Sequence, residues 1–255
     1  MVSIEEGHVI KHVLERVNEL HLSIYKELPL HVVNVITYKK RKKDVEQTLE
    51  KLEGCLKTFP LTTLQQLYRG GMRNLVRSIL IQTLCSYGYL SLNFGFSHGD
   101  LELRNVLIKR IDIEKHPEYA RLIYIVGHVA YIVLTHGIIF VLCDFDTSIV
   151  GKGIAQRTET VHNDVLRFVH VLGKETNIVE LCNLSNQCSN MRPSRCAPLW
   201  LLRECPFSKP IEVTPTRLSR WLEWQAAGVC TLLFIHNDIQ TRSRRLSTDI
   251  RTSRE

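Results

Sequence analysis

The first 60 residues alternate between stretches with helical spacing and one β-branched run. From Glu5 to Leu22, apolar residues recur every three or four positions, which predicts an amphipathic helix. Ser3 precedes this stretch as its N-cap, and Glu6 follows three residues later as in a capping box. The run Leu30–Tyr38 predicts a strand. Asp44–Lys57 returns to helical spacing with glutamate and lysine pairs, and it predicts a surface helix or an ordered insertion.

The middle of the chain combines a long apolar helix with a series of strands. Thr62–Leu90 carries leucine, valine and isoleucine at helical spacing, although Gly70–Gly71 predicts a break or kink within it. A helix that is apolar on most sides belongs in a core. Beyond residue 105 we expect short strands, which form an extended hairpin between residues 111 and 140. These strands are Val106–Ile111, Leu122–Val126, Ala130–Leu134 and Ile138–Cys143.

In the C-terminal third, the periodic pattern of apolar residues is weaker. Asn177–Pro210 contains several prolines and no clear period, so we expect irregular structure there. Thr216–Ala227 predicts a helix, with Trp221 and Trp224 in the core rather than at a ligand site. The tail Thr241–Glu255 is polar and basic, and we expect it to be disordered.

Composition narrows the class of protein. Apolar residues make up 44% and charged residues 23% of the 255 positions, so the chain can build a sizeable core. No apolar run reaches the ~18 residues of a membrane helix, and the acidic start lacks the order of a signal peptide. We therefore expect an intracellular protein without a membrane partner. Eight cysteines without a C-x-x-C pair agree with that expectation.

The charge of the chain bears on its partners. A formal net charge of +7 is moderate, and it favours acidic or phosphorylated partners, including nucleotides. Basic residues concentrate in Lys39–Lys43 and in the tail. We expect both segments to be solvated surface, so a nucleic-acid partner is the weaker hypothesis.

Two acidic stretches carry the candidate chemistry. His98–Asn105 spells H-G-D-L-E-L-R-N and is followed by an apolar strand. Phe140–Asp146 is a second apolar strand that ends in D-F-D. The order, the spacing and the flanking strands resemble the catalytic loop and the metal-binding loop of the protein-kinase-like fold.

That resemblance implies roles for four residues. Asp100 would accept the proton of a substrate hydroxyl, while Asn105 and Asp144 would hold Mg²⁺ across the phosphates of ATP. Their hard oxygen atoms are the ligands that Mg²⁺ requires. Leu107 would form the apolar floor under adenine. The implied cofactors are therefore ATP and Mg²⁺.

A closer resemblance is to kinase-like proteins of large DNA viruses, of the iridovirus and ascovirus type. These proteins carry H-x-D-L-x-x-x-N, a long insertion, a T-x-G turn and a strand that ends in I-D-F. Thr135–Gly137 and Cys143–Phe145 match that order. His162–Phe168 resembles the start of the helix after the activation segment, which implies that Asp164 bonds the backbone of the catalytic loop. A viral protein of this type would lie in the host cytoplasm or the virion.

The chain also departs from the kinase pattern. Asp146 stands where protein kinases usually have glycine, and Glu102 where they often have a phosphate-contacting lysine. No A-P-E motif closes the segment after Asp146. Glu5 or Glu6 would be the helical glutamate that pairs with the nucleotide-binding lysine, but no G-x-G-x-x-G loop and no V-A-I-K strand precede it. We therefore expect that lysine to be missing, with Lys39–Lys43 as the first substitute to consider.

These patterns predict an α+β chain with a protein-kinase-like fold, mainly the helical large lobe with a remnant of the small lobe. Residues 1–60 would form the small-lobe remnant, as one helix and one strand. Residues 61–227 would form the large lobe with its extended hairpin, and residues 228–255 a basic, disordered tail.

The predicted activity is that of a serine/threonine protein kinase, which transfers the γ-phosphate of ATP to the hydroxyl of a protein substrate that the sequence does not specify. Reduced activity would follow from the missing lysine. Two alternatives remain open. A small-molecule kinase of the aminoglycoside-phosphotransferase type is supported by H-G-D-L at His98–Leu101 and by Asp146. A catalytically inactive pseudokinase that acts as a binding module is supported by the missing glycine loop and lysine.

Overall fold

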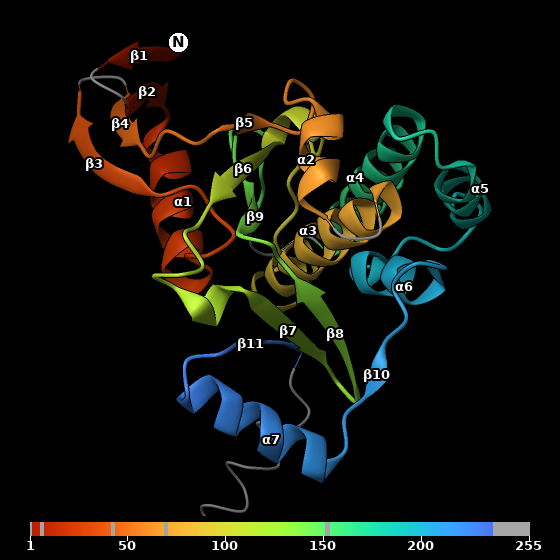
Figure 1. Cartoon of the computed structure of the whole chain (residues 1–255). Coiled ribbons are helices and arrows are strands. Elements are labelled where there is room, and N and C mark those ends of the chain that lie inside the picture. Colours follow the sequence, from red (N-terminus) through yellow and green to blue (C-terminus); the bar gives the residue numbers. More distant parts are fainter. Residues whose placement is uncertain (1, 6–7, 42–43, 69–70, 151–153, 237–255) are drawn as a thin grey trace, which may run out of the picture.

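The computed structural model describes residues 2–5, 8–41, 44–68, 71–150 and 154–236 of the 255-residue chain. These residues form an α+β fold in which two of three small sheets and several helices pack around the buried helix α3 (Met72–Phe94), while the N-terminal sheet lies farther from it (Figure 1). One sheet and the helix α1 (Glu15–Glu27) come from the N-terminal part, and the other two sheets come from the remainder of the chain.

The N-terminal sheet is antiparallel and has the strand order β1-β2-β4-β3. In β4, Val45, Gln47 and Leu49 are buried while Glu46 and Thr48 are partly exposed, as expected for a strand with one covered face. Helix α1 covers that face, packing against β3 and β4. The strands are β1 (Val2–Glu5), β2 (His8–Val13), β3 (Val35–Lys40) and β4 (Val45–Leu49).

The helix predicted from Glu5 to Leu22 is therefore wrong in its first half, because β1 and β2 precede α1, which begins at Glu15. Ser3 lies in β1 and caps no helix, while Glu6 lies outside the described residues. Apolar residues at positions 9, 10 and 13 fit both a helix and a strand. The antiparallel pairing of β2 with β4 decides for the strand.

Two further predictions for the N-terminal part differ from the structure. The helix expected over Asp44–Lys57 is wrong, since this segment forms β4 and the short strand β5 (Gly54–Cys55). Its charged pairs mimic a helical pattern, but alternate residues of β4 face the core. The strand expected at Leu30–Tyr38 begins later, at Val35, and Val32 instead makes an isolated parallel bridge with Leu142.

The second sheet has the order β5-β6-β9, and the third has the order β10-β8-β7-β11. The hairpin predicted between residues 111 and 140 is confirmed, because β7 and β8 pair in antiparallel register. A turn at Thr135–Gly137 then leads into β9. The strands are β6 (Val106–Arg110), β7 (Arg121–Val126), β8 (Val129–Leu134), β9 (Ile138–Leu142), β10 (Ile211–Glu212) and β11 (Thr231–His236).

The helix predicted over Thr62–Leu90 is divided at the glycine pair. The first helix ends at Leu67, and Gly71, whose φ is 73°, is the residue that caps the start of α3. Helix α6 approaches α3 at Gly88, where a Cβ atom would lie 2.8 Å from Leu199 Cδ2. The remaining helices are α2 (Leu61–Leu67), α4 (Ile154–Glu175), α5 (Val179–Cys188), α6 (Ala197–Glu204) and α7 (Pro215–Ala226), with short 3₁₀ turns η1 (Leu103–Asn105) and η2 (Pro117–Tyr119).

The C-terminal third is more regular than its sequence suggests. Helices α5 and α6 occupy the segment predicted to be irregular, because its prolines lie between the helices or in the first turn of α6, where proline is tolerated. The helix predicted at Thr216–Ala227 is confirmed as α7. Part of the predicted tail forms β11, which pairs in parallel with β7. Residues 241–255 lie outside the described residues.

Candidate active site

The loop that carries Asp100 lies between the end of α3 and the turn η1. At Gly99 the φ angle is 81°, and a Cβ atom there would lie 2.8 Å from the carbonyl oxygen of Thr147. The Thr147 hydroxyl donates a hydrogen bond of 3.0 Å to the carbonyl of His98. Glycine at position 99 therefore lets this loop pack directly against the loop that follows β9.

Asp164 of α4 fixes this loop from inside the protein. Its carboxylate accepts the Gly99 amide at 2.9 Å, the Leu101 amide at 3.4 Å and the Tyr87 hydroxyl at 2.6 Å. Burial, followed by the charge of Asp164, raises the pKa of Tyr87 well above its ordinary value, so the phenol stays protonated and can donate. The expectation that Asp164 bonds the backbone of this loop is confirmed.

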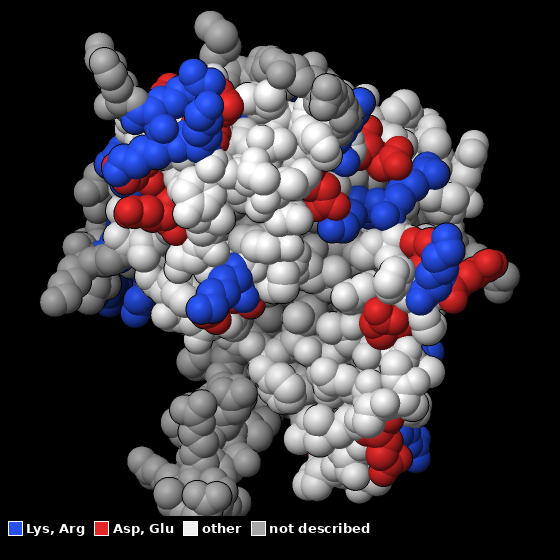
Figure 2. All heavy atoms as spheres, turned by 90° about the vertical axis from the view of Figure 1, so that its left-hand side faces the viewer, with Lys and Arg blue, Asp and Glu red and all other residues white. Residues whose placement is uncertain are grey.

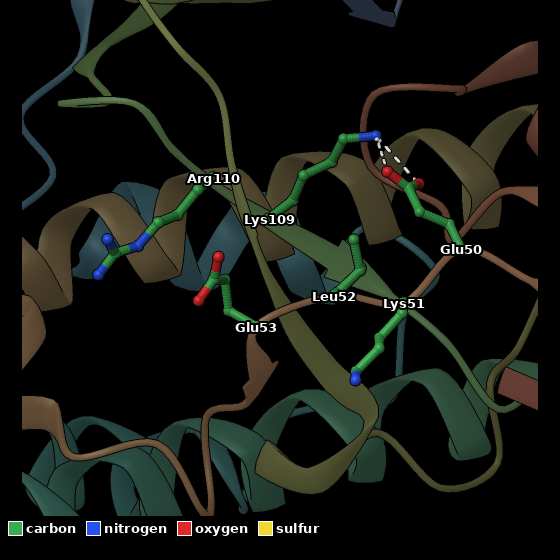
Figure 3. A pocket seen from close by; sticks show the side chains of 6 residues that line it. All are labelled: Glu50, Lys51, Leu52, Glu53, Lys109 and Arg110. Atoms are coloured by element: carbon green, nitrogen blue, oxygen red, sulfur yellow. Dashed lines mark hydrogen bonds and ion pairs between the residues drawn. The ribbon is translucent and has the colours of Figure 1, made fainter. Parts of the chain in front are cut away.

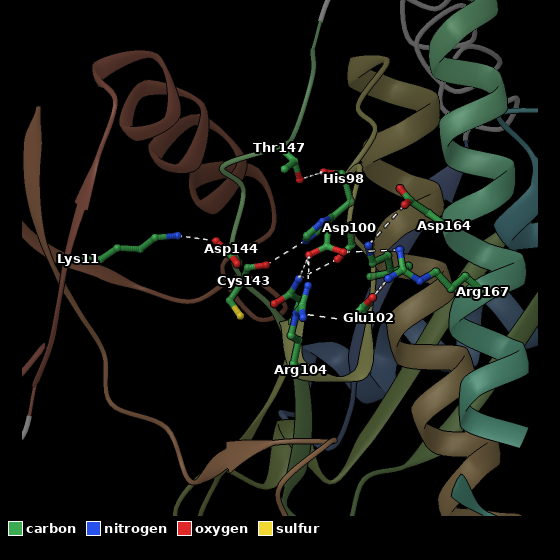
Figure 4. Close-up of polar contacts among 12 residues, drawn as sticks. Lys11, His98, Asp100, Glu102, Arg104, Cys143, Asp144, Thr147, Asp164 and Arg167 are labelled. Atoms are coloured by element: carbon green, nitrogen blue, oxygen red, sulfur yellow. Dashed lines mark hydrogen bonds and ion pairs between the residues drawn. The ribbon is translucent and has the colours of Figure 1, made fainter. Parts of the chain in front are cut away.

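Asp100 belongs to a group of four charged residues that we call the arginine cluster, made of Asp100, Glu102, Arg104 and Arg167. Arg104 donates to Asp100 Oδ2 at 2.8 Å and lies 3.3 Å from Glu102. Arg167 reaches the same two carboxylates from α4 (Figure 4). The hydrogen bond from Arg104 is the main reason that the pKa of Asp100 is lowered, so Asp100 stays ionised.

Asn105 lies between this cluster and the acidic loop after β9. Its side-chain amide donates to the Asp100 carbonyl at 2.7 Å and to Asp100 Oδ2 at 3.1 Å. The backbone carbonyl of Asn105 accepts a hydrogen bond of 3.1 Å from the backbone amide of Cys143. His98 Nε2 donates to the Cys143 carbonyl at 2.9 Å. The structure therefore places the loop of Asp100 and Asn105 next to the acidic loop of Asp144, which lies about 40 positions later in the sequence.

The acidic loop holds Asp144 in an unusual backbone conformation. Its φ is 64°, in the left-handed region that aspartate tolerates better than most residues. Phe145 anchors the loop, because it is buried against the rings of His21, Phe96 and His98. Asp144 and Asp146 remain about half exposed, with 42% and 50% of their side chains accessible. Both carboxylates are thus presented on one side of a fixed aromatic anchor.

Lys11 is the site residue that the sequence patterns missed. Its ammonium extends from β2 to Asp144 Oδ1 at 2.5 Å (Figure 4). It also lies 3.0 Å from Asp146 Oδ1. We call these three residues the lysine cluster. Burial acts to lower the pKa of Lys11, but the bonds to the two carboxylates outweigh it and raise the pKa, so the amine stays charged.

Lys11 therefore lies beside the acidic loop, where the sequence patterns led us to expect no lysine. The signal that could have revealed it is Val9-Ile10-Lys11, an apolar β-branched pair ending in lysine just before a helix. Of the two glutamates expected in the first helix, Glu5 lies in β1 instead, and Glu6 is outside the described residues.

A cavity of about 360 Å³ adjoins the lysine cluster, and Asn105, which bonds to Asp100 of the arginine cluster, also lines it. Leu107, predicted as an apolar floor, lines it together with Asn105 and Asp144. Burial raises the pKa of the Cys143 thiol, which also lines the cavity, to about 12, so it stays protonated. The other lining residues are Val9, Lys11, His12, Val33, Leu49, Glu50 and Asp146.

A second cavity of about 400 Å³ adjoins the first at Glu50. It is lined by the segment Glu50–Glu53 and by Lys109 and Arg110 of β6 (Figure 3). Lys109 forms an ion pair of 2.8 Å with Glu50. The two cavities thus meet where the N-terminal sheet connects to β5.

The donor set of the first cavity fits a hard divalent cation. Asp144 and Asn105 supply a carboxylate and an amide oxygen, Asp146 lies beside Asp144, and Lys11 neutralises only one of the two negative charges of the aspartates. No group of three or more His, Cys, Asp and Glu side chains suited to a metal occurs in the part of the chain that the structure describes. The candidate ligands at the first cavity are carboxylate and amide oxygens, which are the ligands that Mg²⁺ prefers.

The basic run does not reach this site. Lys39, Lys40 and Arg41 are exposed at the end of β3, while Lys42 and Lys43 lie outside the described residues. Lys40 pairs with Glu15, and Arg41 with Glu46. Figure 2 shows this face, where basic groups lie next to acidic ones. Within the described residues, the run therefore behaves as the solvated surface that its composition predicts.

No family model matches the chain, and no curated protein matches it in sequence. Among the described residues, none of the helices combines the length and the apolar character needed to cross a membrane.

Proposed function

We propose that this chain is a phosphotransferase with a protein-kinase-like fold, which transfers the γ-phosphate of ATP to a serine or threonine hydroxyl of a protein. The observation that carries the proposal is the Lys11–Asp144 ion pair. It joins residues 133 positions apart at the edge of a cavity that Asn105 and Leu107 also line. A cation, an acidic metal-binding loop and an ionised aspartate on the neighbouring loop are the groups that phosphoryl transfer needs.

The cavity offers different surroundings to the two ends of a nucleotide. Val9, Leu49 and Leu107 supply apolar surface for a base, while Lys11 supplies positive charge for phosphates. Asn105 and Asp144 would hold Mg²⁺, which when bound neutralises charge on the phosphates. Asp146 lies beside Asp144 and shares its contact with Lys11.

Asp100 would act as the base toward the acceptor hydroxyl. Its Oδ2 atom accepts bonds from Arg104 and Asn105, whereas its Oδ1 atom lies 3.7 Å from the nearest Arg167 nitrogen. Oδ1 is thus the oxygen that an acceptor hydroxyl can approach. The hydroxyl oxygen forms a bond to the γ-phosphorus, its proton passes to Asp100, and the bond from the γ-phosphorus to the bridging oxygen breaks to release ADP.

One observation favours a small-molecule acceptor as the second candidate. A cavity of about 320 Å³ lies on the far side of Glu102 and Arg167, lined also by Phe168 and Val171. This cavity is large enough for a small polar ring, and it adjoins the residues that contact Asp100. The inactive binding module is less well supported than before, because Lys11 would take the place of the lysine that was expected to be missing.

The nucleotide site is tested by thermal unfolding. ATP should raise the melting temperature only when Mg²⁺ is present, because a ligand that binds the folded state stabilises it. Asp144→Asn should abolish this shift and leave the unliganded protein folded. Asp112→Asn, at a solvent-exposed turn, is the matched control and should retain the shift. An equal shift in EDTA would contradict the metal assignment.

The acceptor class is tested by labelled phosphate. A protein kinase should label casein, histone or itself at serine or threonine. A small-molecule kinase should consume ATP with aminoglycosides or sugars and leave proteins unlabelled. If the wild type labels protein and Asp100→Asn does not, small-molecule phosphorylation is excluded as the main activity.

A further inference from the structure

Lys11 has two carboxylate partners, and both come from the same loop. Its side chain is only 14% exposed, so its charge requires close partners. Asp144 and Asp146 provide them at 2.5 and 3.0 Å. The two aspartates flank Phe145, which is buried and fixes the loop that carries them. The position of the ammonium is thus set by the loop after β9.

Helix α1, which packs against the same sheet, contributes no carboxylate to Lys11. Its buried polar residues are Asn18 and His21, and both have other partners. Gln47 donates to Asn18 Oδ1 at 2.9 Å, and His21 donates to the Val33 carbonyl at 2.8 Å. The glutamates of α1 are exposed, namely Glu15, Glu19 and Glu27.

The two aspartates cannot both balance the charge of Lys11 once a divalent cation is bound to Asp144. A divalent cation on Asp144 withdraws charge from that carboxylate and repels the nearby ammonium. Asp146 is then the remaining carboxylate within hydrogen-bond distance of Lys11. It is also the residue that stands where the kinase pattern has glycine, which could not make this contact.

We propose that Asp146 is the positioning residue for Lys11, holding the ammonium at the cavity while Asp144 is engaged by a metal ion. The part played by Lys11 toward phosphates rests on the proposed function. The lysine is thereby anchored by the loop after β9 and not by α1. Helix α1 acts on this anchor only indirectly, through the contact of His21 with Phe145.

The anchor is tested first without nucleotide or metal. Lys11→Met, Asp146→Asn and the double variant are unfolded with urea in EDTA, and their effects are compared as a double-mutant cycle. We expect the two substitutions to be coupled by about threefold or more in the unfolding constant, as for a partly buried charged pair. Lys11→Met with Glu15→Gln is the matched control and should be additive. Additive effects of Lys11→Met and Asp146→Asn would overturn the proposal.

The second test measures the affinity for ADP in EDTA, so that no metal contributes. Asp146→Asn should weaken binding about as much as Lys11→Met does, the double variant should be no weaker, and Asp146→Glu should restore most of the loss. Glu15→Gln and Glu19→Gln should bind as the wild type. If Asp146→Asn alters only the Mg²⁺ dependence, Asp146 is a metal ligand and the proposal fails. If the wild type binds no nucleotide, the proposed function fails, while the cycle still decides what anchors Lys11.

Discussion

The lysine cluster lines the first cavity, and the arginine cluster is connected to that cavity by Asn105, which bonds to Asp100. The two clusters differ in their balance of charge. One ammonium faces two carboxylates in the first, which leaves one negative charge uncompensated. Two guanidinium groups face two carboxylates in the second, so that cluster is neutral. The first cluster is therefore incomplete without another cation, whereas the second is already satisfied.

The clusters also differ in what they present to solvent. In the arginine cluster, Arg104 and Arg167 are 51% and 55% exposed, while the carboxylates of Asp100 and Glu102 are 22% and 17% exposed. In the lysine cluster the ammonium is covered and the carboxylates face outward. A metal ion would be attracted to one side, and an ionised base is held ready on the other. The lysine cluster would therefore act in metal binding and the arginine cluster in proton transfer, and substitutions can separate these two roles.

The largest effect is expected from Asp100→Asn. Loss of a general base should lower phosphate transfer by ~10²-fold or more, while the Mg²⁺-dependent stabilisation by ATP should persist because Asp100 does not hold the metal. The measurement is labelled-phosphate transfer by the wild type and the variant, purified side by side. Asp112→Asn should leave the rate unchanged.

Equal residual transfer by wild type and Asp100→Asn would point to contamination or to another base. The inactive binding module would then become the better hypothesis, and the neutral arginine cluster would have a purely structural role.

The next largest effect concerns the support beneath the arginine cluster. Asp164→Ala leaves two backbone amides and the Tyr87 hydroxyl without their buried acceptor, so the free energy of unfolding should fall by about 3 kcal/mol. Urea unfolding measures it. Asp164→Asn keeps one carbonyl acceptor, so its free energy of unfolding should fall less than that of the alanine variant. A loss below about 1 kcal/mol for the alanine variant would mean that the loop is held by other contacts.

A smaller effect separates charge from structure within the arginine cluster. Arg104→Gln removes the main cause of the lowered pKa of Asp100, so that pKa should rise. Since the base must be ionised, the acid limb of the rate profile should then move to higher pH, while the rate on its plateau changes less. The profile of kcat against pH measures this shift. Arg220→Gln, on the exposed side of α7, should leave the acid limb in place.

The smallest effect is expected from an ion pair outside both clusters. Lys109 and Glu50 form a simple one-to-one pair at the second cavity (Figure 3). Lys109→Met should lower the free energy of unfolding by no more than ~1 kcal/mol, as is typical of pairs near the surface. Urea unfolding of this variant beside Lys115→Met provides the comparison. A much larger loss would show that this pair, and not the two clusters, holds the N-terminal sheet in place.

Sequence patterns predicted the arginine cluster side of the site better than the lysine cluster side. Asp100 and Asn105 lie in one short loop, and Asp144 ends an apolar strand, so their proximity follows from local order. Their roles toward ATP and Mg²⁺ remain predictions. Lys11 was missed because its significance depends on a contact across 133 positions, which no local pattern contains.

The same reason explains the errors in the fold. In β2, the apolar positions fit both a helical and a strand period, and only the pairing with β4 distinguishes them. The hairpin of β7 and β8 was predictable because its strands are adjacent in sequence and separated by a glycine turn. Strand β11 was not, because it finds its partner far away in the chain.

The parallel pairing of β11 with β7 has a consequence for how the chain matures on the ribosome. Thr231 aligns with Leu122, about 110 positions earlier, so the nascent hairpin waits roughly ten seconds of synthesis for its last neighbour. During that interval Ile123 and Ile125 have neither β11 nor α7 to cover them. The hairpin edge is then an open template for other strands, and chaperones that recognise such edges would meet this protein late in translation.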